Sequence, residues 1–493
     1  MKSLSPTQLG LLASIMVALG SFGAGATRNR GGVMRMLGVE NLTYGHGRAL
    51  MDITMTVGIA LLLLAWLWLW RVRPTLDTVR RATWLWTAPL ALSAPMLSRD
   101  VYSYLMQGAM LRDGFDPYSE GAAVNPGPLL WEVSHDWRNT TTPYGPLHLG
   151  LGKLITLVTG DSVGAGIVAY RLLALAGFAL IIVTVPKIAQ RLGGDSAFAL
   201  WIGATNPLML LHMVGGMHNE AVMVGLVSVG ILWALRRPAS VATFSCAIGV
   251  VAVAVSLKAT AAVAMPFIVW LMVAHFAGAS ASFAKKCGAF IVSAAWSLAL
   301  TLGVLYVVTA VSGASWGWLA EISGNSKVIN PLAGPTLVTE ILTPGFQLFD
   351  DHFYYNSLLG VVRNASSLLM LAGLAVVWWR FRPKPGAAND VRAVQGTTAA
   401  YVVAFVTNAV TLPWYYASIL GLVGTFRAPR WVQQTAVGAS VVIVLAFTGG
   451  GNHRFYDAWF LVAAPFVAFA AVLAVWPVRP VRQTKTPSPA RGE

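Results

Sequence analysis

Long apolar runs joined by short connections make up most of this chain. A run of about twenty apolar residues is long enough to cross the hydrocarbon core of a bilayer as an α-helix. Such runs occupy residues 9–26, 52–70, 82–97, 163–185, 197–213, 219–235, 240–257, 259–275, 288–311, 365–379, 397–412, 415–426, 431–449 and 458–477. We therefore expect an all-α polytopic membrane protein, a single domain over residues 1–493 with a bundle of about 13–14 transmembrane helices.

The composition excludes the other broad classes of protein. With 56% hydrophobic and 11% charged residues, the chain has too few polar side chains to cover a soluble globule of 493 residues. Gly follows no period, and Cys246 and Cys287 are the two cysteines, so neither a collagen nor a disulfide scaffold fits. The net charge of +15 would suggest nucleic acid for a soluble protein, but here it first reports topology, and we expect no nucleic-acid partner.

The basic residues predict which connections face the cytoplasm. The run Leu147–Thr159 is too short to cross, so we count it as an interfacial helix. With that choice, one alternating set of connections, together with both termini and the tail at 478–493, holds well over half of the 34 Lys and Arg residues. This side should be cytoplasmic. Residues 27–51 do not follow this pattern, because they carry four arginines and yet fall on the outer side. A competing interpretation takes 9–22 as the apolar part of a cleavable signal.

Most of the carboxylates fall on the opposite, extracytoplasmic side, where two long loops lie at 98–162 and 312–364. The first loop mixes Asp and Glu with many aromatic residues. Carboxylates bind sugar hydroxyls and take protons, while aromatic faces stack on sugar rings. This mixture is typical of a sugar site and makes the first loop the expected catalytic region.

Asp100 is the strongest candidate for a catalytic base. It follows the apolar run 82–97 within Ser98–Tyr104, where water and lipid headgroups are within reach. Arg99 beside it would keep the carboxylate ionised or bind phosphate. The competing interpretation is an interfacial Arg and Asp that only mark the end of a helix.

Further candidates lie at expected outer turns. Lys258 could pair with a lipid phosphate or extend its ammonium to the membrane surface. The segment Gly215–Glu220 could line a site or form a glycine cap followed by a helix start. The other candidates, each with an alternative role in a turn or in packing, are Asp116, Tyr144, Trp414 and Tyr415.

Five short segments carry a resemblance to a known family: Ser98–Tyr104, Asp116–Tyr118, Pro143–Pro146, Gly215–Glu220 and Leu412–Tyr415. In this order the chain resembles the GT-C superfamily of polytopic glycosyltransferases. It is more closely similar to the actinobacterial polyprenol-phosphate-mannose-dependent α-1,6-mannosyltransferases that build the mannan backbone of lipomannan and lipoarabinomannan. The Gly-Gly-x-His-Asn element of that family usually ends in Asp, whereas this chain has Glu220.

The resemblance implies inverting transfer of mannose from polyprenyl-phosphate-mannose to the 6-hydroxyl of a mannan lipoglycan, at the outer face of the plasma membrane and among membrane lipids. It implies Asp100 as catalytic base and Arg99, Lys258 and His218 as ligands of the donor phosphate. The expected substrate-binding residues are Tyr102, Tyr104, Asp116, Tyr144, Asn219, Glu220, Trp414 and Tyr415.

Three questions stay open at this point. No His and carboxylate spacing typical of a metal site stands out, and the cationic side chains could stabilise the departing phosphate, so a divalent metal cofactor is not required; metal dependence is left open. A transporter or flippase of a lipid-linked sugar is the alternative from another class. A GT-C enzyme with another donor or acceptor is the alternative within the superfamily.

Overall fold

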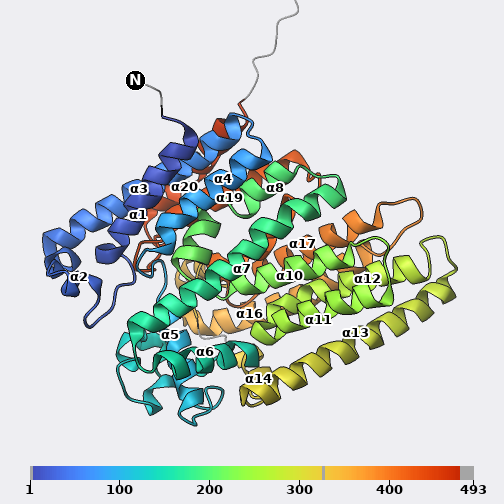
Figure 1. Ribbon diagram of the computed structural model, residues 1–493, viewed down its shortest axis with the longest axis horizontal. Helices are drawn as coiled ribbons and strands as arrows, with labels where there is room; N and C mark the ends of the chain where they lie inside the picture. The colour runs from blue at the N-terminus through green and yellow to red at the C-terminus, as the bar shows by residue number, and fades with distance from the viewer. Residues whose placement is uncertain (1–3, 325–327, 478–493) are drawn as a thin grey trace, which may run out of the picture.

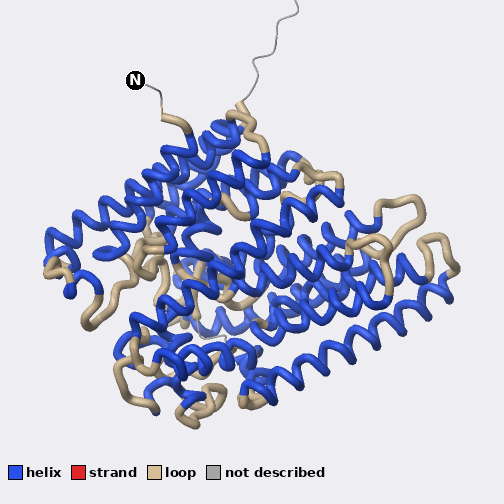
Figure 2. The backbone as a smooth tube through the Cα atoms, viewed as in Figure 1, coloured by secondary structure: helices blue, strands red, loops and turns tan. Residues whose placement is uncertain are grey.

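The computed structural model describes residues 4–324 and 328–477, and within these ranges the chain forms helices and no strand (Figure 2). The helices up to residue 234 are α1 (Pro6–Ala24), α2 (Val33–Met36), η1 (Glu40–Thr43), α3 (Gly45–Arg71), α4 (Leu76–Ala91), α5 (Asp100–Arg112), η2 (Ala122–Val124), η3 (Leu130–Glu132), η4 (His135–Trp137), α6 (Pro146–Thr159), α7 (Val163–Leu192), α8 (Ser196–Gly203), α9 (Pro207–Met209), the π-helical η5 (Leu210–Gly215) and α10 (Glu220–Ala234). The later helices are α11 (Val241–Leu257), η6 (Ala259–Ala264), α12 (Met265–Phe276), α13 (Phe283–Ser312), α14 (Trp318–Gly324), α15 (Gly334–Gln347), α16 (Tyr355–Arg380), α17 (Asn389–Thr407), η7 (Pro413–Tyr416), α18 (Ala417–Val423), α19 (Arg430–Ala446) and α20 (Ala458–Val475).

The expected all-α polytopic fold is confirmed, because every apolar run found in the sequence contains one of these helices. Of the helices in the described residues, seven are long and apolar enough to cross a membrane, and the pair α8 with α9–η5, bent by 46°, would be an eighth. The remaining runs hold helices of 7 to 17 residues, with the exception of α17, which has 19 residues but begins with a polar segment that includes Asp390 and Arg392. The count of about 13–14 crossings therefore stays a prediction, and the tail at 478–493 lies outside the described residues.

Contacts between distant connections sort them into two ends of the bundle. At one end, the segment after α1, both long loops, the α11–η6 turn and the α19–α20 turn contact one another. The bonds that join them are Asn29 N to Glu132 Oε2 (2.6 Å), Leu97 N to Gly449 O (2.7 Å), Ser315 Oγ to Asp116 Oδ2 (2.8 Å) and Gly145 N to Leu257 O (3.1 Å). These are the connections that the sequence places outside, including the dissenting segment 27–51.

The connections expected in the cytoplasm meet at the opposite end. Their bonds are Arg71 Nη1 to Ala474 O (3.0 Å), Arg427 Nε to Gly193 O (3.1 Å) and the ion pair of Arg237 with Asp390 (2.6 Å). In Figure 1, α1 begins at the upper edge, whereas α5, α6 and α14 lie at the lower edge. The partition of connections into two ends thus agrees with the charge pattern.

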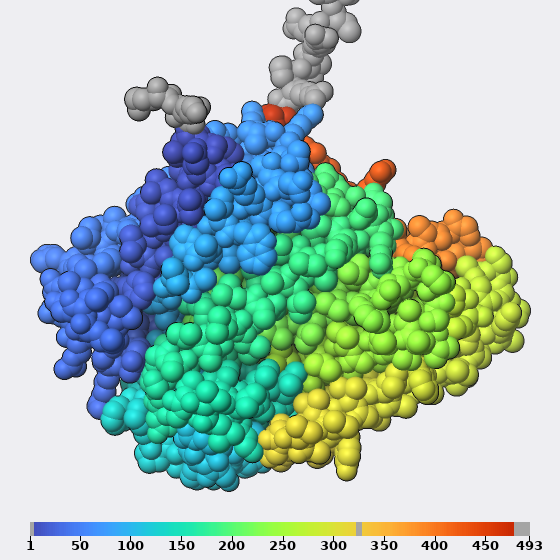
Figure 3. All heavy atoms as spheres, in the orientation of Figure 1, coloured from blue at the N-terminus to red at the C-terminus, as the bar shows by residue number. Residues whose placement is uncertain are grey.

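The packing separates a buried centre from helices that expose apolar side chains. The most apolar windows of α13, α16 and α20 are only 17%, 6% and 11% buried, as expected for helices that face lipid. Among the buried side chains, Trp66 of α3 stacks on Trp201 of α8 with ring centroids 4.5 Å apart. At the lower edge, the helix α6 packs on α5 and lies close to α14 in the space-filling view (Figure 3). Gly108 and Gly152 permit the close approach of α5 and α6, because a Cβ on either would collide with the other backbone.

Candidate functional site

Two chain segments, 97–104 and 217–220, deliver most of the polar side chains of the candidate site. Each begins with a non-glycine residue in the left-handed region: Leu97 has φ 64° and Met217 has φ 54°. A non-glycine residue in this conformation has a strained backbone, and strain of this kind clusters at functional sites. After Leu97, the Ser98 hydroxyl accepts a hydrogen bond from the backbone N–H of Asp100 (3.0 Å) at the start of α5.

Asp100 and His218 face each other at the centre of the site. Nδ1 of His218 lies 3.4 Å from Oδ2 of Asp100, and the Tyr104 hydroxyl donates to the same oxygen at 3.5 Å. His218 is completely buried and stacks on Trp414, with ring centroids 3.6 Å apart. The Asp100 side chain keeps 17% of its surface exposed, so it is open to a substrate.

The surroundings keep Asp100 ionised. Burial alone raises the pKa of the Asp100 carboxyl, but His218, Ser98 and the more distant Lys258 together outweigh it, so its pKa lies below the ordinary value of 3.8. A carboxylate that is deprotonated at neutral pH and reachable from outside can accept a proton from an incoming hydroxyl.

A buried ion pair joins the two other charged groups of the site. Lys258 Nζ pairs with Glu220 Oε1, and their side chains are 8% and 1% exposed. The Lys258 ammonium also lies 4.1 Å from the ring centroid of Tyr415 and 5.4 Å from that of Tyr144. Among the described residues, the second Glu220 oxygen has no hydrogen-bond partner. Position 220 thus holds the partner of Lys258.

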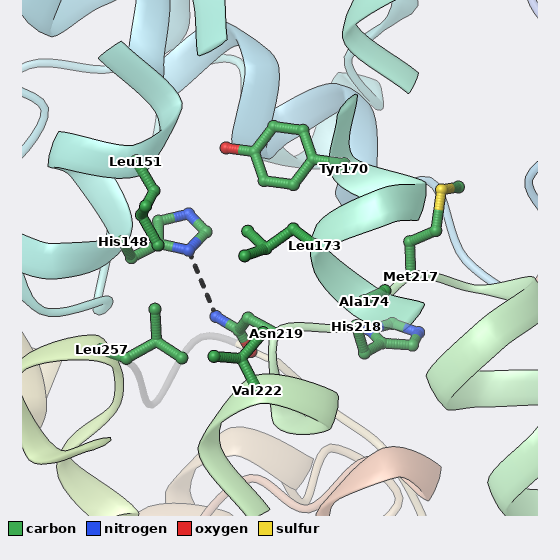
Figure 4. Close-up of a pocket in the computed structure, with 10 residues that line it drawn as sticks. All are labelled: His148, Leu151, Tyr170, Leu173, Ala174, Met217, His218, Asn219, Val222 and Leu257. Carbon is green, nitrogen blue, oxygen red and sulfur yellow. Dashed lines mark hydrogen bonds between the residues drawn. The ribbon is translucent and has the colours of Figure 1, made fainter. Parts of the chain in front are cut away.

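A narrow pocket adjoins the ion pair, lined in part by His148, Tyr170 and Asn219 (Figure 4). The Asn219 amide nitrogen lies 3.3 Å from His148 Nδ1, which accepts because an amide NH₂ group can only donate. Burial and the Lys258 charge lower the pKa of His148 to about 3, so this ring is neutral. His148 was not among the site residues expected from the sequence; the signal that could have found it is a lone His two residues after Pro146 in an apolar segment.

Arg171, a buried cation within the apolar helix α7, holds the two site segments together. Its guanidinium donates to the carbonyls of Leu90 (3.2 Å) and Ser93 (2.9 Å), which precede Asp100. It also donates to the carbonyls of Val214 and Gly215, which precede His218. One rigid fork therefore fixes the end of α4 against the end of η5, and with it the spacing of Asp100 and His218.

Three predicted site residues lie apart from this cluster. Arg99 donates to the Glu132 backbone carbonyl (2.8 Å) and carboxylate (3.3 Å) and to the Thr27 carbonyl (2.7 Å), so its N–H groups bind protein. The Tyr102 hydroxyl donates to the carbonyl of Ala26 (2.7 Å). Asp116 accepts from Ser315 and joins the two long loops.

The remaining predicted residues come together around Asp100. They are Tyr104, Tyr144, His218, Asn219, Glu220, Lys258, Trp414 and Tyr415. Within residues 4–324 and 328–477, no group of three or more His, Cys, Asp or Glu side chains is placed to hold a metal ion. The fixed cation of the cluster is Lys258.

Known proteins match along nearly the whole chain. Residues 7–274 match the family described as alpha-(1->6)-mannopyranosyltransferase, N-terminal domain, and residues 335–477 match the MptB C-terminal domain. Alpha-(1->6)-mannopyranosyltransferase A of Corynebacterium glutamicum is 51% identical, over 96% of this chain and 99% of that protein. The protein of the same name from Mycobacterium tuberculosis is 36% identical, over 96% and 89%. No solved structure matches.

Proposed function

The chain belongs to the alpha-(1->6)-mannopyranosyltransferase family, and from this membership we propose that it moves mannose from polyprenyl-phosphate-mannose to the 6-hydroxyl of an α-1,6-mannan lipoglycan. Family membership supports a membrane-embedded mannosyltransferase. The lipid donor, the mannan acceptor and the outer face of the plasma membrane are the finer part of the proposal.

The observation that carries the mechanism is the meeting of Asp100, Tyr104 and His218 at a partly exposed carboxylate. The acceptor oxygen attacks the anomeric carbon from the face opposite to the phosphate, and Asp100 takes the hydroxyl proton. The new bond joins O6 to C1 while the bond from C1 to the phosphate oxygen breaks, so the configuration inverts. A positioned base of this kind contributes about 10²- to 10⁴-fold to the rate.

The departing lipid phosphate needs a positive partner. Lys258 is suited to this role because it is a buried cation whose ammonium has three N–H donors, and Glu220 Oε1 accepts from it. His218 is a second candidate, since its buried ring lies between Asp100 and Trp414. The placement of Arg99 against Glu132 favours a role in holding the loop rather than in binding phosphate.

A transfer assay tests the proposal. The purified full chain is given synthetic mannosyl-phosphoryl-polyprenol or a nucleotide-linked mannose, with a short α-1,6-mannoside as acceptor. We expect transfer from the lipid donor only, with a new α-1,6 linkage. Transfer from the nucleotide sugar, or another linkage, would contradict the proposal.

Cysteine labelling tests the sidedness. After replacement of Cys246 and Cys287 by Ser, a cysteine is introduced at exposed Ser119 in the first long loop or at exposed Ser280 at the opposite end. We expect an impermeant maleimide to label position 119 in whole cells and to label position 280 only after the membrane is opened. The reverse pattern would place Asp100 in the cytoplasm.

A further inference from the structure

A second cluster of polar and aromatic side chains lies at the same end of the bundle as Asp100. It consists of Glu340 on α15, Tyr355 at the start of α16, and His453 and Tyr456 in the turn between α19 and α20. The Tyr456 hydroxyl donates to Glu340 Oε1 at 2.6 Å, and the His453 and Tyr456 rings lie 4.9 Å apart. Tyr355 lies within electrostatic reach of Glu340 and of Arg363, whose guanidinium donates to the Val328 carbonyl at 2.7 Å. None of these four residues takes part in the chemistry proposed above.

The cluster holds polar atoms that the protein itself leaves unused. Among the described residues, the Tyr355 hydroxyl and Nδ1 of His453 are buried atoms without a hydrogen-bond partner. Buried polar atoms in native proteins are nearly always paired, so each of these is suited to a ligand. The Tyr456 ring remains 64% exposed beside them.

The turn that carries His453 and Tyr456 packs directly on the segment that carries Asp100. The Leu97 N–H donates to the Gly449 carbonyl at 2.7 Å, and a Cβ on Gly451 would lie 3.4 Å from Cα of Ser98. The turn that carries part of the second cluster is therefore in direct backbone contact with the catalytic segment, and no helix lies between them. A chain-like ligand whose end lies at Asp100 can continue across this turn.

The chemistry of the cluster fits a neutral sugar. A carboxylate accepts hydrogen bonds from ring hydroxyls, while the phenol and imidazole groups both donate and accept. An exposed aromatic ring offers a face for the apolar side of a pyranose. The Lys258 end of the site, by contrast, holds a buried ammonium.

We propose that Glu340, Tyr355, His453 and Tyr456 form an acceptor subsite for mannose units behind the one that reacts at Asp100. The inference rests on the proposed function, because it assigns the mannan acceptor to a definite surface. The subsite favours acceptors of several sugars over a single mannoside, since only the longer chains reach it.

Binding of oligomannosides tests the subsite without requiring transfer. The full chain carrying Asp100→Asn is titrated with α-1,6-linked mannosides of one, two and four sugars, and tryptophan fluorescence or calorimetry gives each Kd. We expect the tetrasaccharide to bind about 10-fold more tightly than the monosaccharide, as for one charge-assisted hydrogen bond. Glu340→Gln and Tyr456→Phe should each remove this gain and leave binding of the monosaccharide unchanged.

Tyr306→Phe is the matched control, because it removes an exposed phenol from α13 outside the cluster. It should retain the length dependence. Equal binding of all lengths by the Asp100→Asn protein, or an unchanged gain in both cluster variants, would overturn the subsite. Absence of transfer by the unaltered chain, combined with length-dependent binding that the cluster variants lose, would refute the proposed function and support the subsite.

Discussion

The buried pair of Glu220 and Lys258 makes a prediction that can be measured as a free energy. Glu220→Gln leaves the Lys258 ammonium, whose side chain is 8% exposed, without its counter-charge. Lys258→Met leaves the Glu220 carboxylate, 1% exposed, in the same position. Removing one partner of a buried pair costs about 3–5 kcal/mol, whereas replacing both by neutral groups of similar volume is often nearly neutral.

We therefore expect each single variant to lose about 3 kcal/mol of unfolding free energy and the double variant to lose about 1 kcal/mol or less. The coupling energy of the cycle is then about 5 kcal/mol. Unfolding of the purified protein in mixed micelles, titrated with sodium dodecyl sulfate and followed by tryptophan fluorescence, gives the three values. Losses that add up in the double variant would show that the two charges do not depend on each other.

The same variants separate the structural role of Lys258 from its catalytic one. The double variant should fold about as stably as the unaltered chain. Its mannose transfer should nevertheless be slower, because it lacks the ammonium proposed to stabilise the leaving phosphate. Normal transfer by the double variant would refute the phosphate role of Lys258, but it would not affect the structural role assigned to the ion pair.

Three further outcomes follow from the site. In His218→Ala the pKa of Asp100 should rise, because burial raises this pKa and His218 lowers it. The active form is the carboxylate, so the low-pH limb of the kcat/KM profile should move to higher pH. A limb that does not move would contradict the contact between His218 and Asp100. Arg99→Gln and Glu132→Gln should each lower thermal stability and leave KM for the lipid donor unchanged, whereas a raised donor KM in Arg99→Gln alone would restore its phosphate role. Arg171→Lys should lower kcat by up to about 10²-fold at unchanged donor KM, since a Lys cannot hold both segments in place. If Arg171→Lys and Arg171→Gln both lowered the yield of folded protein equally but kept a normal kcat, Arg171 would not position Asp100 and His218.

The sequence predicted well what depends on local pattern. Apolar runs marked the helices because each must bury or present to lipid a continuous apolar surface. The Asp100 and His218 segments stood out because each places polar and charged residues directly against the end of an apolar run. The basic connections predicted the partition of loops that the contacts between Asn29 and Glu132 and between Arg71 and Ala474 reproduce.

What the sequence could not supply is the direction in which a side chain points. Arg99 and Asp100 are neighbours, yet Arg99 faces Glu132 and Asp100 faces His218, since successive residues at a helix start point to different sides. The pairing of Glu220 with Lys258 depends on the packing of α10 beside α11, and no local pattern specifies it. Arg171 looked like an isolated charge because all of its partners are backbone carbonyls, which carry no sequence signature.

The central claim is that Asp100 removes the proton of the acceptor hydroxyl. The direct test is the turnover of the Asp100→Asn protein with mannosyl-phosphoryl-polyprenol and a short α-1,6-mannoside. This turnover is compared with that of the unaltered protein, after the two proteins have been shown to have the same thermal stability. The account predicts a loss of about 10²- to 10⁴-fold in kcat with donor and acceptor still bound. A rate within a few-fold of the unaltered protein would contradict it.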